Sequence, residues 1–213
     1  MADNLVVSIG RQFGSGGREI GTLVAKQLGI AFYDKEILAE AAKKSGIVQE
    51  VFENMDEKPT SSLLYSLSMG GSYAAPLFYG YYTDSMPTSD RLFMWQAQTI
   101  RQFAQEGPCV IIGRCADYIL RDSTALVSVF VHANMDVRAA RIVRLYNLRE
   151  DKARVLIRKT DKSRANYYNF STDRNWGALE NYDLCLDSGK LGVEKSAELI
   201  CQYVRMRQEL AKG

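Results

Sequence analysis

Short apolar runs alternate with stretches of helical spacing along most of the chain. The first run, residues 5–9, ends in a glycine-rich turn, as is typical of a buried parallel strand. Residues 19–28 then place apolar side chains at helical spacing, and a second brief run covers residues 30–33. Asp34 stands where it could cap a helix that reaches about residue 44. The order strand, glycine loop, helix, strand predicts the start of a parallel α/β sheet.

Three more apolar runs follow in the second half of the chain. They predict strands over residues 109–112, 126–131 and 182–187. The intervening periodicity predicts helices over residues 91–106, 116–120, 135–147, 150–168 and 193–210. Five strands separated by helices predict a doubly wound, five-stranded parallel sheet. A length of 213 residues favours one such α/β domain over residues 1–213.

The middle of the chain lacks this regularity. Residues 50–59 predict an acidic helix, and residues 65–87 then gather glycine, serine and five of the twelve tyrosines. We expect an irregular insert over about residues 45–90. Two interpretations are open: the insert covers an acceptor site, or its aromatic surface is buried in a homodimer.

Charge is nearly balanced overall, with a formal net charge of +2, but it is unevenly distributed. Between Arg138 and Arg164 there are ten Lys or Arg residues and three acidic ones. Such a local basic stretch suits an anionic ligand; the alternative is a solvated helix face. No motif that reads DNA or RNA accompanies it, so we do not expect a nucleic-acid partner.

The four cysteines contain no C-x-x-C pair, and the chain has one histidine, His132. This composition gives no zinc pattern and favours buried, reduced thiols. No stretch resembles a signal peptide or approaches the length of a membrane span. We therefore expect a cytoplasmic protein without a membrane partner.

The run from Gly10 to Glu19 carries the candidate chemistry. A glycine-rich turn between a first strand and a first helix lets backbone N–H groups converge on phosphate oxygens. We expect the phosphate to be bound by the residues at the centre of the run, which are Gly14, Ser15, Gly16 and Gly17. The alternative is a purely structural turn.

The match to the P-loop pattern G-x-x-x-x-G-K-[ST] is incomplete in both possible registers. In one register Arg11 replaces the first glycine and Gly17 replaces the lysine. In the other, Arg18 replaces the lysine and Glu19 replaces the Ser/Thr. Arginine binds phosphate with a permanent charge, so Arg18 or Arg11 could take the catalytic place of the lysine. A dinucleotide-binding pattern fails because position 19 is not glycine.

The order of several motifs resembles that of cytidylate kinases. These motifs are the Gly-Ser-Gly turn, Gly113-Arg114 after the third strand, and the pair Asp161 and Arg164 in a late basic helix. The chain is still more similar to the cytidylate kinase-like family in residues 11–20, 113–117 and 182–184. The resemblance covers nearly the whole chain apart from the tyrosine-rich middle.

This resemblance implies a P-loop nucleoside monophosphate kinase fold with a helical lid over about residues 145–165. It implies transfer of the γ-phosphoryl group of ATP, with Mg²⁺, to CMP or dCMP as small-molecule nucleotide acceptor. By position in the family pattern, the acceptor-binding residues are Asp34, Arg114, Asp161 and Arg164. Arg164 is also a catalytic candidate, and Arg138 and Arg141 are candidates for binding the phosphates of ATP. The sequence does not indicate which residues bind the metal.

Two departures keep other functions open. The P-loop lysine is absent, which favours a phosphate-binding protein without phosphoryl transfer. Glu40 stands where the family has an acceptor-site arginine, which favours a kinase for another small acceptor. Locally, Arg114 could instead pair with Asp117, and Asp161 with Arg164 as a surface ion pair.

Overall fold

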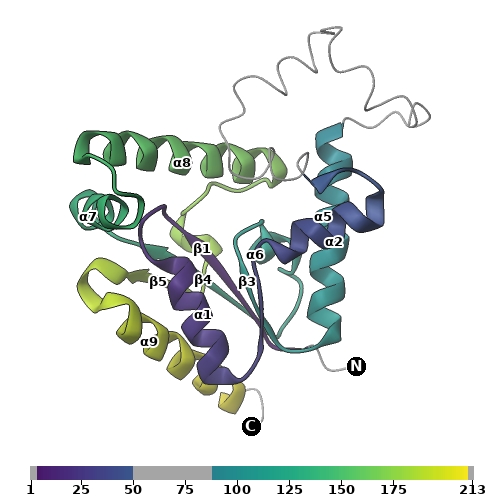
Figure 1. The fold of residues 1–213 in the computed structure, drawn as a ribbon. Coiled ribbons are helices and arrows are strands. Elements are labelled where there is room, and N and C mark those ends of the chain that lie inside the picture. The colour runs from purple at the N-terminus through teal and green to yellow at the C-terminus, as the bar shows by residue number, and fades with distance from the viewer. Residues whose placement is uncertain (1–3, 50–87, 211–213) are drawn as a thin grey trace, which may run out of the picture.

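The computed structural model describes residues 4–49 and 88–210. Its centre is a five-stranded, all-parallel sheet with the strand order β2-β3-β1-β4-β5 (Figure 1). The strands are β1 Val6–Arg11, β2 Ala31–Tyr33, β3 Cys109–Ile112, β4 Leu126–His132 and β5 Leu184–Asp187. The predicted doubly wound α/β sheet is confirmed.

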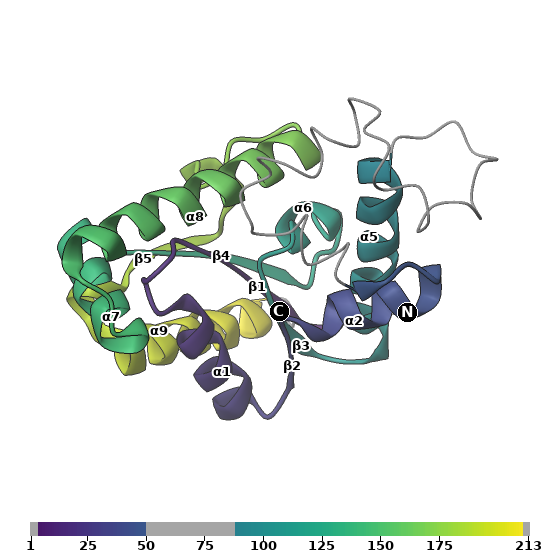
Figure 2. The ribbon, with the colours of Figure 1, turned by 45° about the horizontal axis from the view of Figure 1, so that its top comes forward.

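Helices cover both faces of this sheet (Figure 2). On one face lie α1 (Gly17–Leu28) and α9 (Ser188–Leu210). The opposite face carries α5 (Thr88–Glu106), α6 (Ala116–Ile119) and α8 (Glu150–Ser171). The remaining helices are α2 (Glu36–Ser45), α7 (Met135–Tyr146) and the short 3₁₀ helix η2 (Leu179–Asn181).

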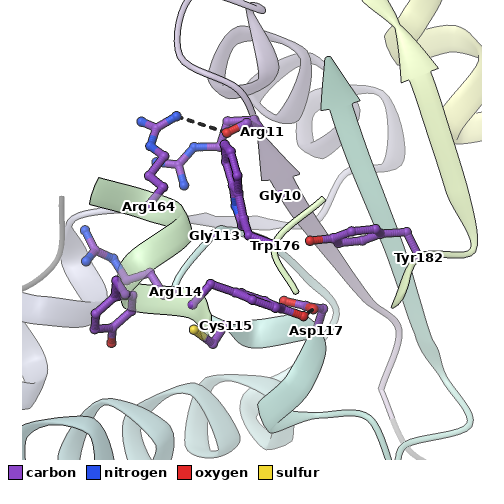
Figure 3. Close-up of a pocket in the computed structure, with 11 residues that line it drawn as sticks. Gly10, Arg11, Gly113, Arg114, Cys115, Asp117, Arg164, Trp176 and Tyr182 are labelled. Carbon is purple, nitrogen blue, oxygen red and sulfur yellow. Dashed lines mark hydrogen bonds between the residues drawn. The ribbon is translucent and has the colours of Figure 1, made fainter. Parts of the chain in front are cut away.

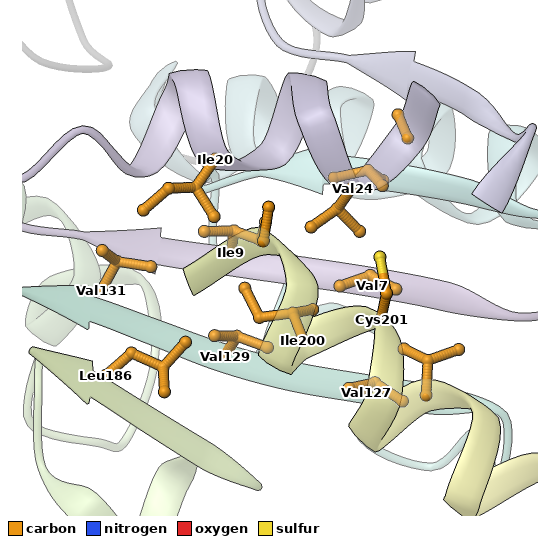
Figure 4. Packing of buried hydrophobic residues seen from close by; sticks show 14 of the residues in the cluster. Val7, Ile9, Ile20, Val24, Val127, Val129, Val131, Leu186, Ile200 and Cys201 are labelled. Carbon is orange, nitrogen blue, oxygen red and sulfur yellow. The ribbon is translucent and has the colours of Figure 1, made fainter. Parts of the chain in front are cut away.

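The apolar character of the strands follows from this double cover. In β1, Val7 and Ile9 pack against Ile20 of α1 and Ile200 of α9 (Figure 4). Val6, which points to the other face, belongs to the second core with α5 and α6. A central parallel strand is buried on both sides, so it has no polar alternation.

The ladder between β1 and β3 determines where the site lies. Ile9 is in register with Ile112, and the backbone N–H of Gly113 donates to the carbonyl oxygen of Ile9 over 3.0 Å. The carboxyl ends of both strands therefore meet, and Gly10 lies beside Gly113. In open parallel sheets, ligands bind beyond such strand ends.

The predicted element bounds are close to the observed ones, with instructive differences. The prediction that Asp34 caps α2 is wrong: Lys35 is the N-cap residue, and the carboxylate of Asp34 accepts a hydrogen bond from Arg18. The last helix begins earlier than predicted, with a break at Gly192 (φ 75°). The predicted helix over residues 50–59 and the tyrosine-rich residues 65–87 lie outside the described residues, so the insert and the homodimer stay predictions.

Candidate active site

The glycine loop connects the end of β1 to the start of α1. Gly14 (φ 81°) and Gly16 (φ 83°) adopt left-handed conformations, which glycine reaches without strain. Gly16 is the N-cap residue of α1 and has no side chain to cap it. The positive end of the helix and its first N–H groups thus lie in the loop that the sequence assigns to phosphate.

Asp161 and Arg138 hold this loop from outside. Asp161 of α8 accepts hydrogen bonds from the backbone N–H of Phe13, at 2.7 Å, and from Nη1 of Arg138, at 2.5 Å. Arg138 is 6% exposed, and its backbone carbonyl would lie 3.0 Å from a Cβ at Gly14. Asp161 pairs with Arg138 and not with Arg164, so the surface-pair alternative does not apply. Both residues shape the loop backbone.

Arg141 and Arg18 lie on different sides of the loop. A Cβ at Gly16 would be 2.9 Å from Cζ of Arg141, so this guanidinium lies against the loop, where it also pairs with Glu19. Arg18 extends away toward the end of β2. Its Nε donates to Oδ2 of Asp34 over 2.6 Å, and its side chain is 66% exposed.

A cleft opens beside the loop on the α6 and α8 side of the sheet (Figure 3). Its lining comes from the ends of β1 and β3, from α6 and α8, and from the segment before β5. The lining residues are Gly10, Arg11, Gly113, Arg114, Cys115, Asp117, Arg164, Tyr167, Tyr168, Trp176 and Tyr182. Arg11, Arg114 and Arg164 are predicted site residues, and the structure brings the three together.

The three arginines reach the cleft from three different elements (Figure 3). Nη1 of Arg164 donates to the backbone carbonyl of Arg11 over 3.0 Å. Nε of Arg114 donates to the backbone carbonyl of Asp34 over 3.3 Å, which ties the end of β3 to that of β2. Gln96 of α5 supports this wall, because its Nε2 donates to the backbone carbonyl of Arg114 and to the hydroxyl of Tyr167. Such a wall of guanidinium groups suits an anionic ligand.

Asp117 and Tyr168 form a buried pair at the opposite wall. The hydroxyl of Tyr168 donates to Oδ2 of Asp117 over 2.6 Å. Burial raises the pKa of Asp117 above its ordinary value, although the hydrogen bond from Tyr168 lowers it in part. Burial and the nearby Asp117 also raise the pKa values of Tyr168 and Tyr182.

Neither residue of this pair was predicted as a site residue. Asp117 was expected only as a possible ion-pair partner of Arg114. The position of Asp117, just past β3 in the run 113–117, was the available signal. Tyr168 carried none, because it is brought to Asp117 from 51 residues away.

The described residues offer little for metal binding or for thiol chemistry. Among residues 4–49 and 88–210, no group of three or more His, Cys, Asp or Glu side chains could hold a metal ion. The cysteines in these ranges are free, and burial raises the pKa of Cys109 to about 12. In the same ranges, no helix is long and apolar enough to cross a membrane.

Residues 6–190 match the profile of the cytidylate kinase-like family. The chain belongs to this family. The match includes the glycine loop, the cleft and the helices α7 and α8, so the resemblance seen in the sequence motifs is confirmed. No curated protein matches the chain significantly.

Two solved structures define the fold further. An uncharacterized protein from Eubacterium ventriosum ATCC 27560 is 26% identical, with a TM-score of 0.70 over 94% of this chain and 98% of that chain. Shikimate kinase from Bacteroides thetaiotaomicron is 12% identical, with a TM-score of 0.52 over 94% of this chain and 98% of that chain. The chain therefore has the nucleotide-binding, kinase-like α/β fold.

Proposed function

We propose that this cytidylate kinase-like protein transfers the γ-phosphoryl group of ATP to a small anionic acceptor bound in the cleft. One observation carries the proposal: Arg11 begins the glycine loop and also lines the cleft. A phosphate on the loop and an acceptor in the cleft would therefore meet at one residue. Phosphoryl transfer requires mainly such positioning and positive charge around the moving group.

The loop fits the triphosphate of ATP. Gly14, Ser15, Gly16 and Gly17 lie directly before and at the start of α1, where backbone N–H groups can bind phosphate, and Arg141 adds a positive charge beside Gly16. Arg138 contributes by holding the loop in this shape. Mg²⁺ in such sites is bound largely by phosphate oxygens with one or two carboxylates, and it neutralises charge on the phosphates.

The cleft fits an acceptor with a negative charge and a flat or apolar part. Arg114 and Arg164 would bind its anionic group, while Tyr167 and Trp176 offer aromatic surface. CMP and dCMP have this character, as the family name suggests. So do small hydroxy acids such as shikimate, the acceptor of the kinase with the same fold. Asp34 remains an acceptor-site candidate next to Arg114.

Residues of about 145–165, most of them in α8, would act as the lid, and α7 leads into it. Helices α7 and α8 form one packed pair. They pack on each other through Ala139, Ile142, Ala153 and Ile157, with Phe13 of the glycine loop against them. Asp161 links the same pair to the loop. Closure of a lid over bound ATP would exclude water, which otherwise hydrolyses the γ-phosphate.

A second function has one specific observation in its favour. The first helical residue, Gly17, offers no side chain where a P-loop carries its lysine. A protein built this way could bind ATP or another phosphate ester without transferring phosphate, and act as a sensor.

A coupled assay for ADP separates the two functions. Protein and MgATP are incubated with CMP, dCMP, other nucleoside monophosphates and shikimate in turn. We expect acceptor-dependent ADP formation, and a decrease in kcat/KM of about 10²–10³-fold for Arg164→Ala. Arg158→Ala, an exposed arginine of the same helix, is the matched control and should stay within about twofold. ATP binding without turnover for any acceptor would favour the sensor.

A further inference from the structure

Two glycines leave room for the side chain of Arg11. A Cβ at Gly17 would lie 2.6 Å from Cβ of Arg11 and 3.1 Å from its Cγ. A Cβ at Gly113 would lie 2.0 Å from Nη1 of Arg11. The arginine therefore begins in the space that a side chain at position 17 would occupy, and its guanidinium runs along Gly113 into the cleft wall.

We propose that Arg11 supplies the phosphate-binding cation that P-loops otherwise carry as the lysine at position 17. This inference rests on the proposed function and deepens it. The charge comes from the end of β1, across the loop, and not from the first turn of α1. Gly17 is then glycine because Arg11 fills its place.

The position of Arg18 argues against the other candidate. Arg18 follows Gly17 on α1, but its Nε is 2.6 Å from Oδ2 of Asp34 and its side chain is largely exposed. Arg18 does not line the cleft, whereas Arg11 does. An arginine between the loop and the cleft can bind two phosphate oxygens at once, which a lysine cannot do with the same geometry.

The backbone of Arg11 is also held in place. Its carbonyl oxygen accepts the hydrogen bond from Arg164, and Arg11 is in register with Val131 of β4. A side chain that leaves a strand end fixed on both sides loses less conformational freedom when it binds phosphate. The fixed backbone therefore favours phosphate binding by the side chain of Arg11.

The test compares Arg11→Ala, Arg11→Lys and Arg18→Ala by isothermal titration with MgATP and with inorganic tripolyphosphate. We expect Arg11→Ala to weaken both affinities at least tenfold, and Arg11→Lys to recover only part of the loss. Arg18→Ala should change them by less than about threefold. The matched control is Arg158→Ala, and thermal unfolding establishes that each variant is folded.

A double variant tests directly whether a lysine at position 17 can replace Arg11. Gly17→Lys alone should disrupt the loop, because its Cβ meets that of Arg11. Combined with Arg11→Ala, the lysine has room, and it should restore MgATP affinity at least threefold above that of Arg11→Ala.

Three results would contradict the inference about Arg11 or the proposed function. A large loss for Arg18→Ala with none for Arg11→Ala would overturn the inference and leave the proposed function standing. A folded double variant that binds no better than Arg11→Ala would also count against it. Absence of any nucleotide or tripolyphosphate binding by the unaltered protein would instead overturn the proposed function, and the inference with it.

Discussion

The carboxylate of Asp161 accepts a hydrogen bond of 2.7 Å from the backbone N–H of Phe13, although the two residues are 148 positions apart. Its other oxygen is paired with Arg138. Arg164, one turn further along the same helix, lies with its guanidinium 5.6 Å from the centre of the Phe13 ring. The shape of the glycine loop is thus coupled to the helix pair α7 and α8.

Asp161→Asn tests this coupling. The amide keeps an acceptor for Phe13 but removes the negative charge that faces the nearly buried Arg138. We expect the free energy of unfolding to fall by about 2 kcal/mol, as when a buried polar partner is lost. MgATP affinity should fall about tenfold, since the loop is less well held.

The matched control for this change is Asp151→Asn on the same helix. Asp151 pairs with Arg149 at an exposed position, so its loss should cost less than about 1 kcal/mol and leave affinity unchanged. Urea unfolding and isothermal titration measure both effects. Equal behaviour of the two variants would mean that Asp161 does not shape the loop.

A comparison of Gly16→Ala with Gly29→Ala separates the cost of backbone strain from the loss of phosphate binding at the glycine loop. Both glycines have positive φ, 83° and 66°, so alanine should cost about 1–2 kcal/mol of folding free energy at each. Beyond this strain, the new methyl group at position 16 meets the guanidinium of Arg141, while at position 29 it meets nothing within 4 Å. Only Gly16→Ala should weaken MgATP binding, by at least tenfold. A similar affinity for both variants would show that the phosphates do not bind at this loop.

The buried carboxyl of Asp117 gives stability a pH dependence of defined sign. Its folded pKa is raised by burial, so the folded protein binds this proton more tightly than the unfolded chain does. The free energy of unfolding should therefore fall as the pH rises from about 3.9, the unfolded value, through the raised folded pKa. The loss amounts to about 1.4 kcal/mol for each unit between the two pKa values.

Asp117→Asn removes the titrating carboxyl group while it keeps an acceptor for the hydroxyl of Tyr168. The neighbouring Tyr168 and Tyr182 do not titrate in this range, because both of their pKa values are raised. Urea unfolding of both proteins between pH 4 and 7 gives the difference directly. That difference should move in favour of the variant as the pH rises; a difference independent of pH would contradict the assignment.

The fold was predictable because its signals are local. Residues 109–112 are apolar throughout since both faces of β3 are covered, and the observed bounds equal the predicted ones. The glycine loop was equally predictable, because the left-handed conformations at Gly14 and Gly16 favour glycine, which is recognisable in the sequence. The order of such motifs was sufficient to indicate the family.

Side-chain directions were not predictable in the same way. Arg11 and Arg18 are equivalent in the sequence, yet Arg11 lines the cleft while Arg18 reaches Asp34, because they leave a strand end and a helix start. The carboxylate of Asp34 pairs with Arg18, and Asp34 therefore does not cap α2. The contact between Asp117 and Tyr168 depends on how α8 crosses the sheet, which no local pattern encodes.

Isothermal titration of the unaltered protein with ATP in the presence of Mg²⁺, repeated with inorganic tripolyphosphate, tests the central claim most directly. If the loop from Gly10 to Arg18 binds phosphate, both ligands should bind at one site per chain, and tripolyphosphate should compete with ATP. Absence of binding by either ligand would contradict the account and leave the glycine loop as a structural turn.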